Sequence, residues 1–283
     1  MFDRVLVAMD LSPATEALVS VLPDLKDFGT KEVNLVHAAK PVKNPVSQSL
    51  RRVEDIRARL RTLAARLEET GLTVTVDVPT GSPAAEIVRI ANEWDPDILM
   101  VGTRSHTKLY EAFVGSVAWE LVRRAQRPVL LHRIEASRPD PEAALESRSS
   151  GVPNSVVYAT DFSEAAERAL PWVLQLAALG VPEFIVLHVE DADTAETRTE
   201  AQGRLDLLAT QLREAGAAKV RAVIRSGVPS EEVLAVGGRD PDSMVVMATQ
   251  GRGFLPGIVL GSESRQVARR AAAPVLLVPS GKE

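Results

Sequence analysis

The stretch Val5-Leu-Val-Ala-Met-Asp10-Leu-Ser12 is repeated later in the chain as Val156-Val-Tyr-Ala-Thr-Asp161-Phe-Ser163. Each version is a mostly apolar run that ends in an aspartate and, two positions on, a serine. A continuous apolar run favours a strand buried on both faces of a parallel sheet, whereas a half-exposed strand would alternate apolar and polar residues. The repetition indicates that the chain contains one structural unit twice.

Other landmarks recur in the same order in both copies. Leu35-Val-His37 recurs as Val186-Leu-His188 at the spacing of the first repeat, and three later motifs recur at a slightly shorter spacing. The later pairs are Gly81-Ser-Pro83 with Gly227-Val-Pro229, Gly115-Ser116 with Gly261-Ser262, and Arg127-Pro-Val-Leu-Leu131 with Ala273-Pro-Val-Leu-Leu277. The spacing changes near Lys40 to Leu50, which suits an insertion in a surface connection. Ordered landmarks at near-constant spacing predict a duplication.

The duplication divides the chain into two domains. We expect an N-terminal domain at residues 1–134 and a C-terminal domain at 154–283, joined by a polar linker at 135–153. Strands are expected in the first copy at 5–9, 33–38, 73–78, 98–101 and 129–131, and the second copy repeats them all. Helical patterns lie between the strands, most clearly at 51–69. The prediction is an α/β protein with two tandem doubly wound five-stranded parallel sheets of the Rossmann-like type.

Composition excludes several classes of protein. The 283 residues carry a net charge of −5 with both signs mixed along the chain, so no basic stripe indicates a nucleic-acid partner. No apolar run approaches the roughly 18 residues of a membrane span. The absence of cysteine excludes disulfides and thiolate metal sites. We therefore expect a cytoplasmic protein that binds neither nucleic acid nor membranes.

The fold class selects the place where a ligand would bind. In doubly wound sheets, ligands bind beyond the carboxyl ends of the strands where the strand order reverses. If the first and fourth strands flank that point, the lining residues are Asp10 and Gly102 in the first copy and Asp161 and Ala248 in the second. The sequence therefore predicts one candidate site in each copy.

Glycines and serines follow the fourth strand of the second copy. The chain reads Ala248-Thr-Gln-Gly251-Arg-Gly253 and then Gly261-Ser262-Glu263-Ser264 at the start of a helix. Glycines let the backbone approach an anion closely, and a helix N-terminus supplies free N–H groups. A single Gly-Ser pair is more often only a helix cap. Its recurrence at matching positions in both copies favours an anion site.

These motifs resemble the universal stress protein family, in its tandem form, over essentially both copies. The ATP-binding signature of that family is Gly, two residues, Gly, nine residues, Gly, then Ser or Thr. The second copy aligns with it at Ala248, Gly251, Gly261 and Ser262, and the first copy at Gly102, Ser105, Gly115 and Ser116. Each copy therefore departs once from the signature, with alanine at its first position in the second copy and serine at its second position in the first.

The resemblance implies an adenine-nucleotide α-hydrolase-like fold with ATP, with or without Mg²⁺, as the ligand. It assigns the strand-ending aspartates to the nucleoside, and backbone groups to the adenine. The implied contacts are Asp10 and Ala38 in the first copy, and Thr160, Asp161 and Val189 in the second. Arg252 and Lys108 could reach phosphates, although solvent exposure accounts for them equally well.

The two candidate sites differ in quality. Nucleotide binders of the family often continue as Gly-Ser-x-Ser/Thr, which Ser264 satisfies and Ala118 does not. Alanine at position 248 adds one methyl group, whereas Ser105 replaces a glycine that would be needed if the backbone there has a positive φ. We therefore expect the stronger site in the second copy and a degenerate one in the first.

The remaining polar residues favour structural roles. His37 and His188 are expected to be oriented strand-end residues near the sites, and the four histidines form no metal motif. The acidic stretch Glu190-Asp-Ala-Asp193 is interpreted as a solvated loop. Arginines that end the last helix of each copy complement the helix dipole. Those arginines are Arg123, Arg124, Arg269 and Arg270.

Three functions remain open at this point. The first is a regulatory module that binds an adenine nucleotide and hydrolyses it slowly or not at all, because the Gly-x4-Gly-Lys-Ser/Thr loop of fast phosphoryl transfer is missing. The second is a nucleotide-free interaction protein, since some members of the resembled family lack the glycines. The third, less favoured, is an adenylate-forming or flavin-binding enzyme, which would usually carry a Ser-Gly-Gly loop after the first strand.

The resemblance also implies how the copies associate. In single-domain members the last strand pairs with its equivalent in a dimer. Here residues 129–131 and 275–278 would pair within one chain and close two sheet edges. We expect an intrachain pseudo-dimer; a further homodimer stays open, and no protein partner is identified.

Overall fold

The computed structural model describes residues 2–12, 15–41, 46–105, 112–135, 152–190, 198–252 and 260–281. The predicted linker lies almost entirely outside these ranges, as do Pro13, Lys108 and the acidic residues from Asp191 to Asp193. Among the residues that the structure describes, no helix is long and apolar enough to cross a membrane.

The first copy alternates strands and helices from its start. Its elements are β1 (Arg4–Ala8), α1 (Thr15–Val19), the 3-10 helix η1 (Pro23–Phe28), β2 (Glu32–Val36), α2 (Val46–Glu68), β3 (Thr73–Asp77), α3 (Pro83–Trp94), β4 (Ile98–Ser105), β5 (Ala112–Phe113), α4 (Ser116–Arg124) and β6 (Val129–Glu135). The five strands expected from the sequence are all present, and β5 is an additional short one.

The second copy repeats this order. Its elements are β7 (Ser155–Ala159), α6 (Glu164–Glu167), α7 (Leu170–Ala178), β8 (Glu183–Glu190), α8 (Arg198–Glu214), β9 (Lys219–Ser226), α9 (Pro229–Val233), the π-helical turn η2 (Leu234–Gly238), β10 (Ser243–Ala248), α10 (Ser262–Arg270) and β11 (Val275–Val278). Helix α2 is longer than its equivalent α8, as the additional residues of the first copy would allow.

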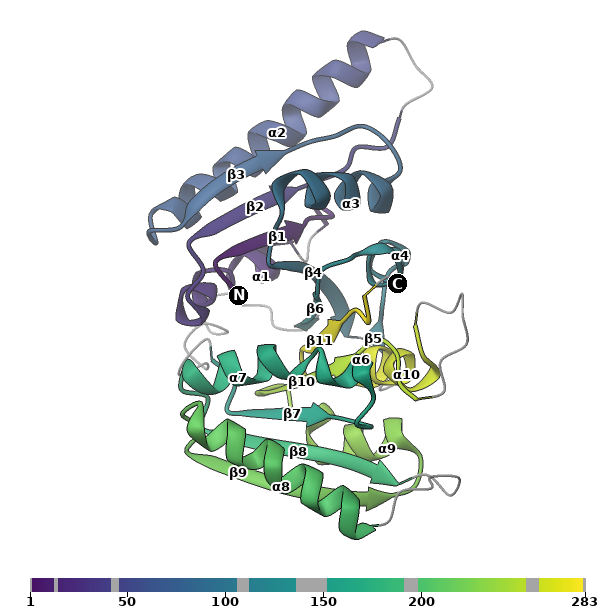
Figure 1. Cartoon of the computed structure of the whole chain (residues 1–283). Helices are drawn as coiled ribbons and strands as arrows, with labels where there is room; N and C mark the ends of the chain where they lie inside the picture. Colours follow the sequence, from purple (N-terminus) through teal and green to yellow (C-terminus); the bar gives the residue numbers. More distant parts are fainter. Residues whose placement is uncertain are drawn as a thin grey trace.

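The strands of both copies form one continuous sheet (Figure 1). Their order is β3-β2-β1-β4-β6-β11-β10-β7-β8-β9. Pairing along this path is parallel within each copy and antiparallel only between β6 and β11, where Leu276 lies opposite Leu130. The predicted pairing of the last strands within one chain is therefore confirmed. Strand order reverses between β1 and β4 in the first copy and between β7 and β10 in the second, as expected.

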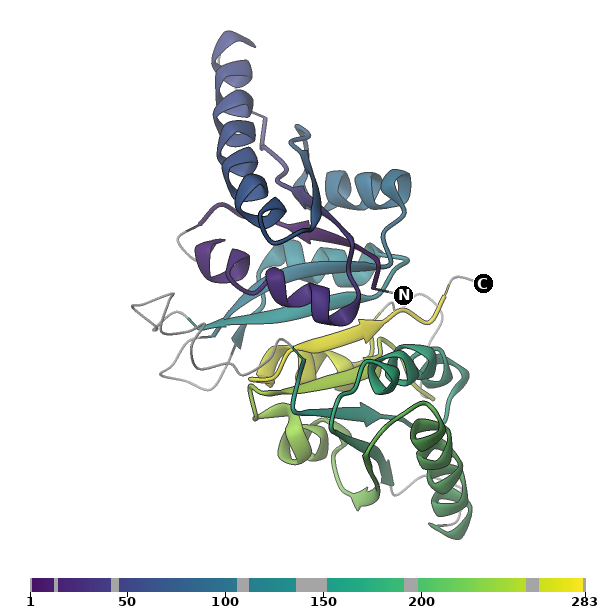
Figure 2. The same ribbon diagram turned by 90° about the vertical axis from the view of Figure 1, so that its left-hand side faces the viewer.

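Helices bury both faces of the sheet. Successive strand residues point to opposite faces, so Val5 and Val7 join one apolar core while Leu6 and Ala8 join the other. The first core packs under α1, η1 and α2 of one copy and α7 and α8 of the other; the second packs under α3, α4, α9 and α10. In Figure 2 the strands run through the middle of the molecule with helices on both sides. Burial on both faces explains the continuous apolar runs in the sequence.

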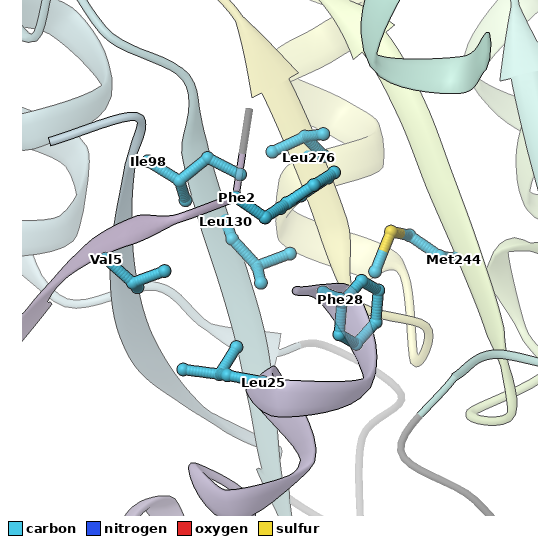
Figure 3. A pocket seen from close by; sticks show the side chains of 8 residues that line it. All are labelled: Phe2, Val5, Leu25, Phe28, Ile98, Leu130, Met244 and Leu276. Atoms are coloured by element: carbon cyan, nitrogen blue, oxygen red, sulfur yellow. The ribbon is translucent and has the colours of Figure 1, made fainter. Parts of the chain in front are cut away.

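An apolar junction joins the copies on the first of these faces. Phe2 packs between Phe28 of the first copy and Trp172 of the second, with ring centroids 5.6 Å and 5.3 Å away. Beside it lies a wholly apolar cavity of about 20 Å³, to which Met244 and Leu276 of the second copy contribute (Figure 3). The junction is therefore continuous with the core.

Two strands of the first copy are longer than expected. The sequence predicted a strand at 98–101 and another at 129–131, whereas β4 reaches Ser105 and β6 reaches Glu135. The added residues pair with each other through to Ser105 opposite Glu135, and β5 pairs with the end of β4. The sequence did not predict the extension because most of these residues are polar, and their ladder partners are distant in sequence.

Candidate functional site

The candidate site of the second copy lies at the end of β7, between β8 and β10. Asp161 follows β7, the loop from Thr249 to Arg252 follows β10, and Gly261 precedes α10. Gly261 donates its backbone N–H to the carbonyl of Thr249 at 2.7 Å, which brings the start of α10 back to the end of β10. Three of the predicted segments therefore meet at the switch point.

The carboxylate of Asp161 joins the two loops. Its Oδ1 accepts hydrogen bonds from the backbone N–H and the hydroxyl of Ser163, at 3.0 and 2.6 Å. Its Oδ2 accepts the backbone N–H of Arg252 at 2.6 Å. A Cβ atom on Gly251 would lie only 2.3 Å from that Oδ2. Only glycine at position 251 lets the loop approach the carboxylate this closely.

The residue after each aspartate adopts a left-handed backbone conformation. Phe162 has φ +59° and Leu11, its equivalent, has φ +53°. Such residues are uncommon when they are not glycine, and strain of this kind often occurs at functional sites. The ring of Phe162 stacks on His188 at 4.4 Å on one side and lies 4.3 Å from the guanidinium of Arg204 on the other. These contacts hold the turn that follows Asp161.

The paired histidines support the same turn. His188 Nδ1 lies 2.9 Å from the carbonyl of Thr160, and His37 Nδ1 lies 2.9 Å from that of Met9. A carbonyl only accepts, so each Nδ1 carries the proton. Burial lowers the pKa of His37, against the opposing effect of its bond to Met9. His37 follows the end of β2 and His188 lies within β8, and each ring is oriented by the residue that follows the first strand of its copy.

The start of α10 has backbone amides without partners inside the helix and side chains that form hydrogen bonds with nearby residues. Ser262 is exposed and donates its hydroxyl to Glu263 at 3.3 Å. Glu263 in turn accepts the backbone N–H of Ser230, at the start of α9. Ser264 is buried, and its hydroxyl bonds the carbonyl of Thr249 at 2.8 Å. Ser264 thus stabilises the loop, a contact that Ala118 in the first copy cannot make.

In the equivalent region of the first copy, the described residues continue as strands. Gly102 and Ser105 lie within β4, paired with β6. A Cβ on Gly102 would lie 2.4 Å from Cδ1 of Ile134, so this glycine makes room for a core side chain. The carboxylate of Asp10 accepts the backbone N–H of Ser12 at 2.9 Å. Within the described residues, the first copy therefore repeats the turn at the aspartate, whereas residues 103–105 continue β4 where the second copy has its loop.

The other predicted residues occupy supporting positions. Thr160 is buried, and its hydroxyl accepts the backbone N–H of Phe162 at 3.0 Å. Ala248 ends β10, and Val189 lies within the ladder between β8 and β9. Ala38 is buried just beyond β2, whereas Gly115 and the exposed Ser116 open α4. Among the described residues, no group of three or more histidines and acids is arranged to hold a metal ion.

Sequence patterns did not reveal two side chains that support the site, Phe162 and Arg204. Their contact depends on how α8 packs against the end of β7, and these segments are separated by two helices and a strand. One feature of the sequence could have indicated Phe162: a large apolar residue stands between the aspartate and the serine in both copies.

Comparisons with known proteins match both copies. Residues 1–133 and 154–279 fit the model of the universal stress protein family. A universal stress protein of Mycolicibacterium smegmatis is 25% identical over 296 residues, covering 97% of this chain and 96% of that protein. One from Methanocaldococcus jannaschii is 28% identical over 151 residues, covering 44% of this chain and 93% of that protein. A universal stress protein structure from Archaeoglobus fulgidus matches with a TM-score of 0.79 and 22% identity, covering 99% of this chain and 100% of that one.

Proposed function

Since the chain belongs to the universal stress protein family, we propose that it is a stress-response regulatory module that binds ATP, with or without Mg²⁺, at the switch point of its C-terminal copy. The N-terminal copy then serves as a degenerate partner. Hydrolysis is slow or absent, because the chain lacks the lysine-bearing loop with which fast phosphoryl-transfer enzymes hold the β- and γ-phosphates.

One observation carries this proposal: a carboxylate, a glycine loop and a helix N-terminus meet at the switch point of the second copy. Asp161 supplies an acceptor for a nucleoside hydroxyl or amino group. The loop at Gly251 brings backbone amides close to that carboxylate. The first amides of α10 lack helical partners and favour an anion such as a phosphate. Asp161 therefore suits the nucleoside end of a nucleotide, and the amides of α10 suit its phosphate end.

The test is titration calorimetry of the full chain with Mg-ATP. Asp161→Asn keeps the shape of the side chain but removes the negative charge on which three donors converge. We expect it to weaken binding about tenfold or more, because hydrogen bonds to a charged group are the strong ones. Asp10→Asn is the matched control, since Asp10 makes the same turn in the first copy. Equal loss in both variants would contradict the assignment to the second copy.

A nucleotide-free interaction protein is the second candidate, and the same carboxylate favours it. Both oxygens of Asp161 already accept hydrogen bonds from the protein, so the loop is closed without a ligand. If that closure is the whole role of Asp161, wild-type protein will bind no Mg-ATP, and mass spectrometry after native purification will find no adenine nucleotide. Either a measurable affinity or retained nucleotide excludes this candidate.

A further inference from the structure

A buried arginine of the first copy reaches the helix that opens the candidate phosphate site. Arg133 lies near the end of β6 and is only 8% exposed. One terminal nitrogen, Nη1, donates to the hydroxyl of Thr103 at 2.8 Å, and Nη2 donates to the backbone carbonyl of Ala268 in α10. The contact therefore crosses from the first copy to the last turn of α10 in the second.

No carboxylate among the described residues pairs with this arginine. Within the described part of the chain, its partners are the hydroxyl of Thr103 and the helix carbonyl of Ala268, and Nε is buried without one. Burial lowers the pKa of Arg133 to about 10, which reflects the desolvation of its charge. The favourable charge nearby is the partial negative charge at the C-terminal end of α10. A buried cation of this kind is costly to keep for packing alone.

The second copy does not make the equivalent contact with the first. The shared motif that ends in Leu131 and Leu277 aligns Arg133 with Pro279, which has no cation to offer. Helix α4, the counterpart of α10, therefore receives no such arginine from the second copy. The pseudo-symmetry of the chain is broken at this position.

A second contact joins α10 to the first copy nearer its start. The guanidinium of Arg265 lies 5.9 Å from the ring centroid of Trp119, which belongs to α4. Strand β5 of the first copy also contacts α10, and Figure 1 places α4, β5 and α10 along one side of the molecule. Helix α10 is thus held by the first copy along its length, while its first turn faces the candidate site.

We propose that Arg133 is a positioning residue through which the N-terminal copy orients α10, and so sets the affinity of the C-terminal copy for the phosphates of its nucleotide. The proposal rests on the function proposed above. A helix of this length moves as a rigid rod, so a contact on its last turn determines where its first amides point. In this way the first copy becomes part of the site of the second copy.

The test compares wild-type protein with Arg133→Met, a side chain of similar length without charge. Titration with Mg-ATP should show binding weakened about tenfold, within the range by which residues between coupled sites alter affinity. The melting temperature should stay unchanged or rise, because a buried charge without a counter-ion gives little stability. Hydrogen exchange in nucleotide-free protein should become faster in α10 but not in α4, which has the same length of nine residues.

Two further variants keep the result interpretable. Arg123→Met removes an exposed arginine that pairs with Glu120 on α4, and it should change neither affinity nor exchange. Arg133→Lys keeps the charge and should restore part of the affinity. Unchanged exchange in α10, or unchanged affinity in Arg133→Met, would overturn the positioning role while leaving the ATP site intact. Failure of the wild type to bind Mg-ATP would overturn both proposals.

Discussion

Single side chains hold the turn that carries the site aspartate. Phe162 bears the backbone strain of a left-handed residue, which costs about 1–3 kcal/mol. Its ring lies between His188 and Arg204, and those contacts offset part of that cost. Tyr158, at the same end of β7, donates its hydroxyl to the carbonyl of Ala166 at 2.8 Å. The turn is therefore anchored on both sides of Asp161.

Tyr158 predicts how stability depends on alkaline pH. Burial raises the pKa of its hydroxyl to about 12, from 10.0 in an exposed tyrosine. Because the folded pKa is the higher one, the folded state keeps this proton longer than the unfolded state. The stabilisation is present below pH 10 and is lost as pH rises toward 12; it amounts to about 2–3 kcal/mol.

Urea denaturation of wild type and Tyr158→Phe from about pH 9 to about pH 11.5 measures this effect. The difference in unfolding free energy should favour the wild type near pH 9 and shrink as pH rises. Arg133 is present in both proteins, so its own titration cancels in the difference. Parallel pH profiles for the two proteins would show that Tyr158 is not the group responsible.

Among the elements, η1 has the clearest structural role. This short 3-10 helix places Leu25 and Phe28 over the strands where the two copies meet. Its last residue packs on Phe2, which also contacts Trp172 of α7. Figure 3 shows the side chains of η1, β1, β10 and β11 that line the small cavity, with Phe28 of η1 beside Met244 of β10. The start of the chain is thus part of the junction between the copies.

Phe2→Ala tests the importance of this junction. Phe2 is 4% exposed and already borders a cavity, so truncation should enlarge the void and lower the unfolding free energy by about 3–5 kcal/mol. Urea denaturation followed by tryptophan fluorescence measures the loss, since Trp172 contacts the deleted ring. Leu207→Ala is the control, because Leu207 is 61% exposed and should change stability by no more than about 0.5 kcal/mol.

The whole molecule is organised as one sheet with two shared cores. Each core cluster contains residues of both copies, and strands β6 and β11 join the halves by backbone hydrogen bonds. Figures 1 and 2 show α2 and α8 at opposite ends of this assembly, with the shared strands in the middle. Continuous cores couple the stability of one copy to that of the other.

This coupling predicts cooperative unfolding. Differential scanning calorimetry of the wild type should show one transition for both copies. Leu276→Glu places a charge at a position that is 1% exposed and lies opposite Leu130, and it should uncouple the copies into two transitions or unfold the protein. Two well-separated transitions in the wild type would contradict a shared core. Leu207→Glu, at a position that is 61% exposed, serves as the unperturbed comparison.

Local patterns were sufficient to predict the architecture. Apolar runs such as 5–9 marked strands buried on both faces, and the repeat placed Asp10 and Asp161 at equivalent strand ends. The order of strands around the switch point followed from the fold class, and the pairing of the last strands was implied by the family resemblance; the structure confirmed both. The strands and the repeat depend on periodicity and spacing, which a sequence records directly.

Only the tertiary structure decided what the site residues contact. Gly102 fits the signature, yet the space beside it is taken by Ile134 of another strand. Ser264 was expected at a phosphate, and its hydroxyl bonds the carbonyl of Thr249. Arg133 gave no signal at all, because its partner Ala268 is in the other copy. Each contact joins residues that are distant along the chain, and packing of the folded elements alone brings such residues together.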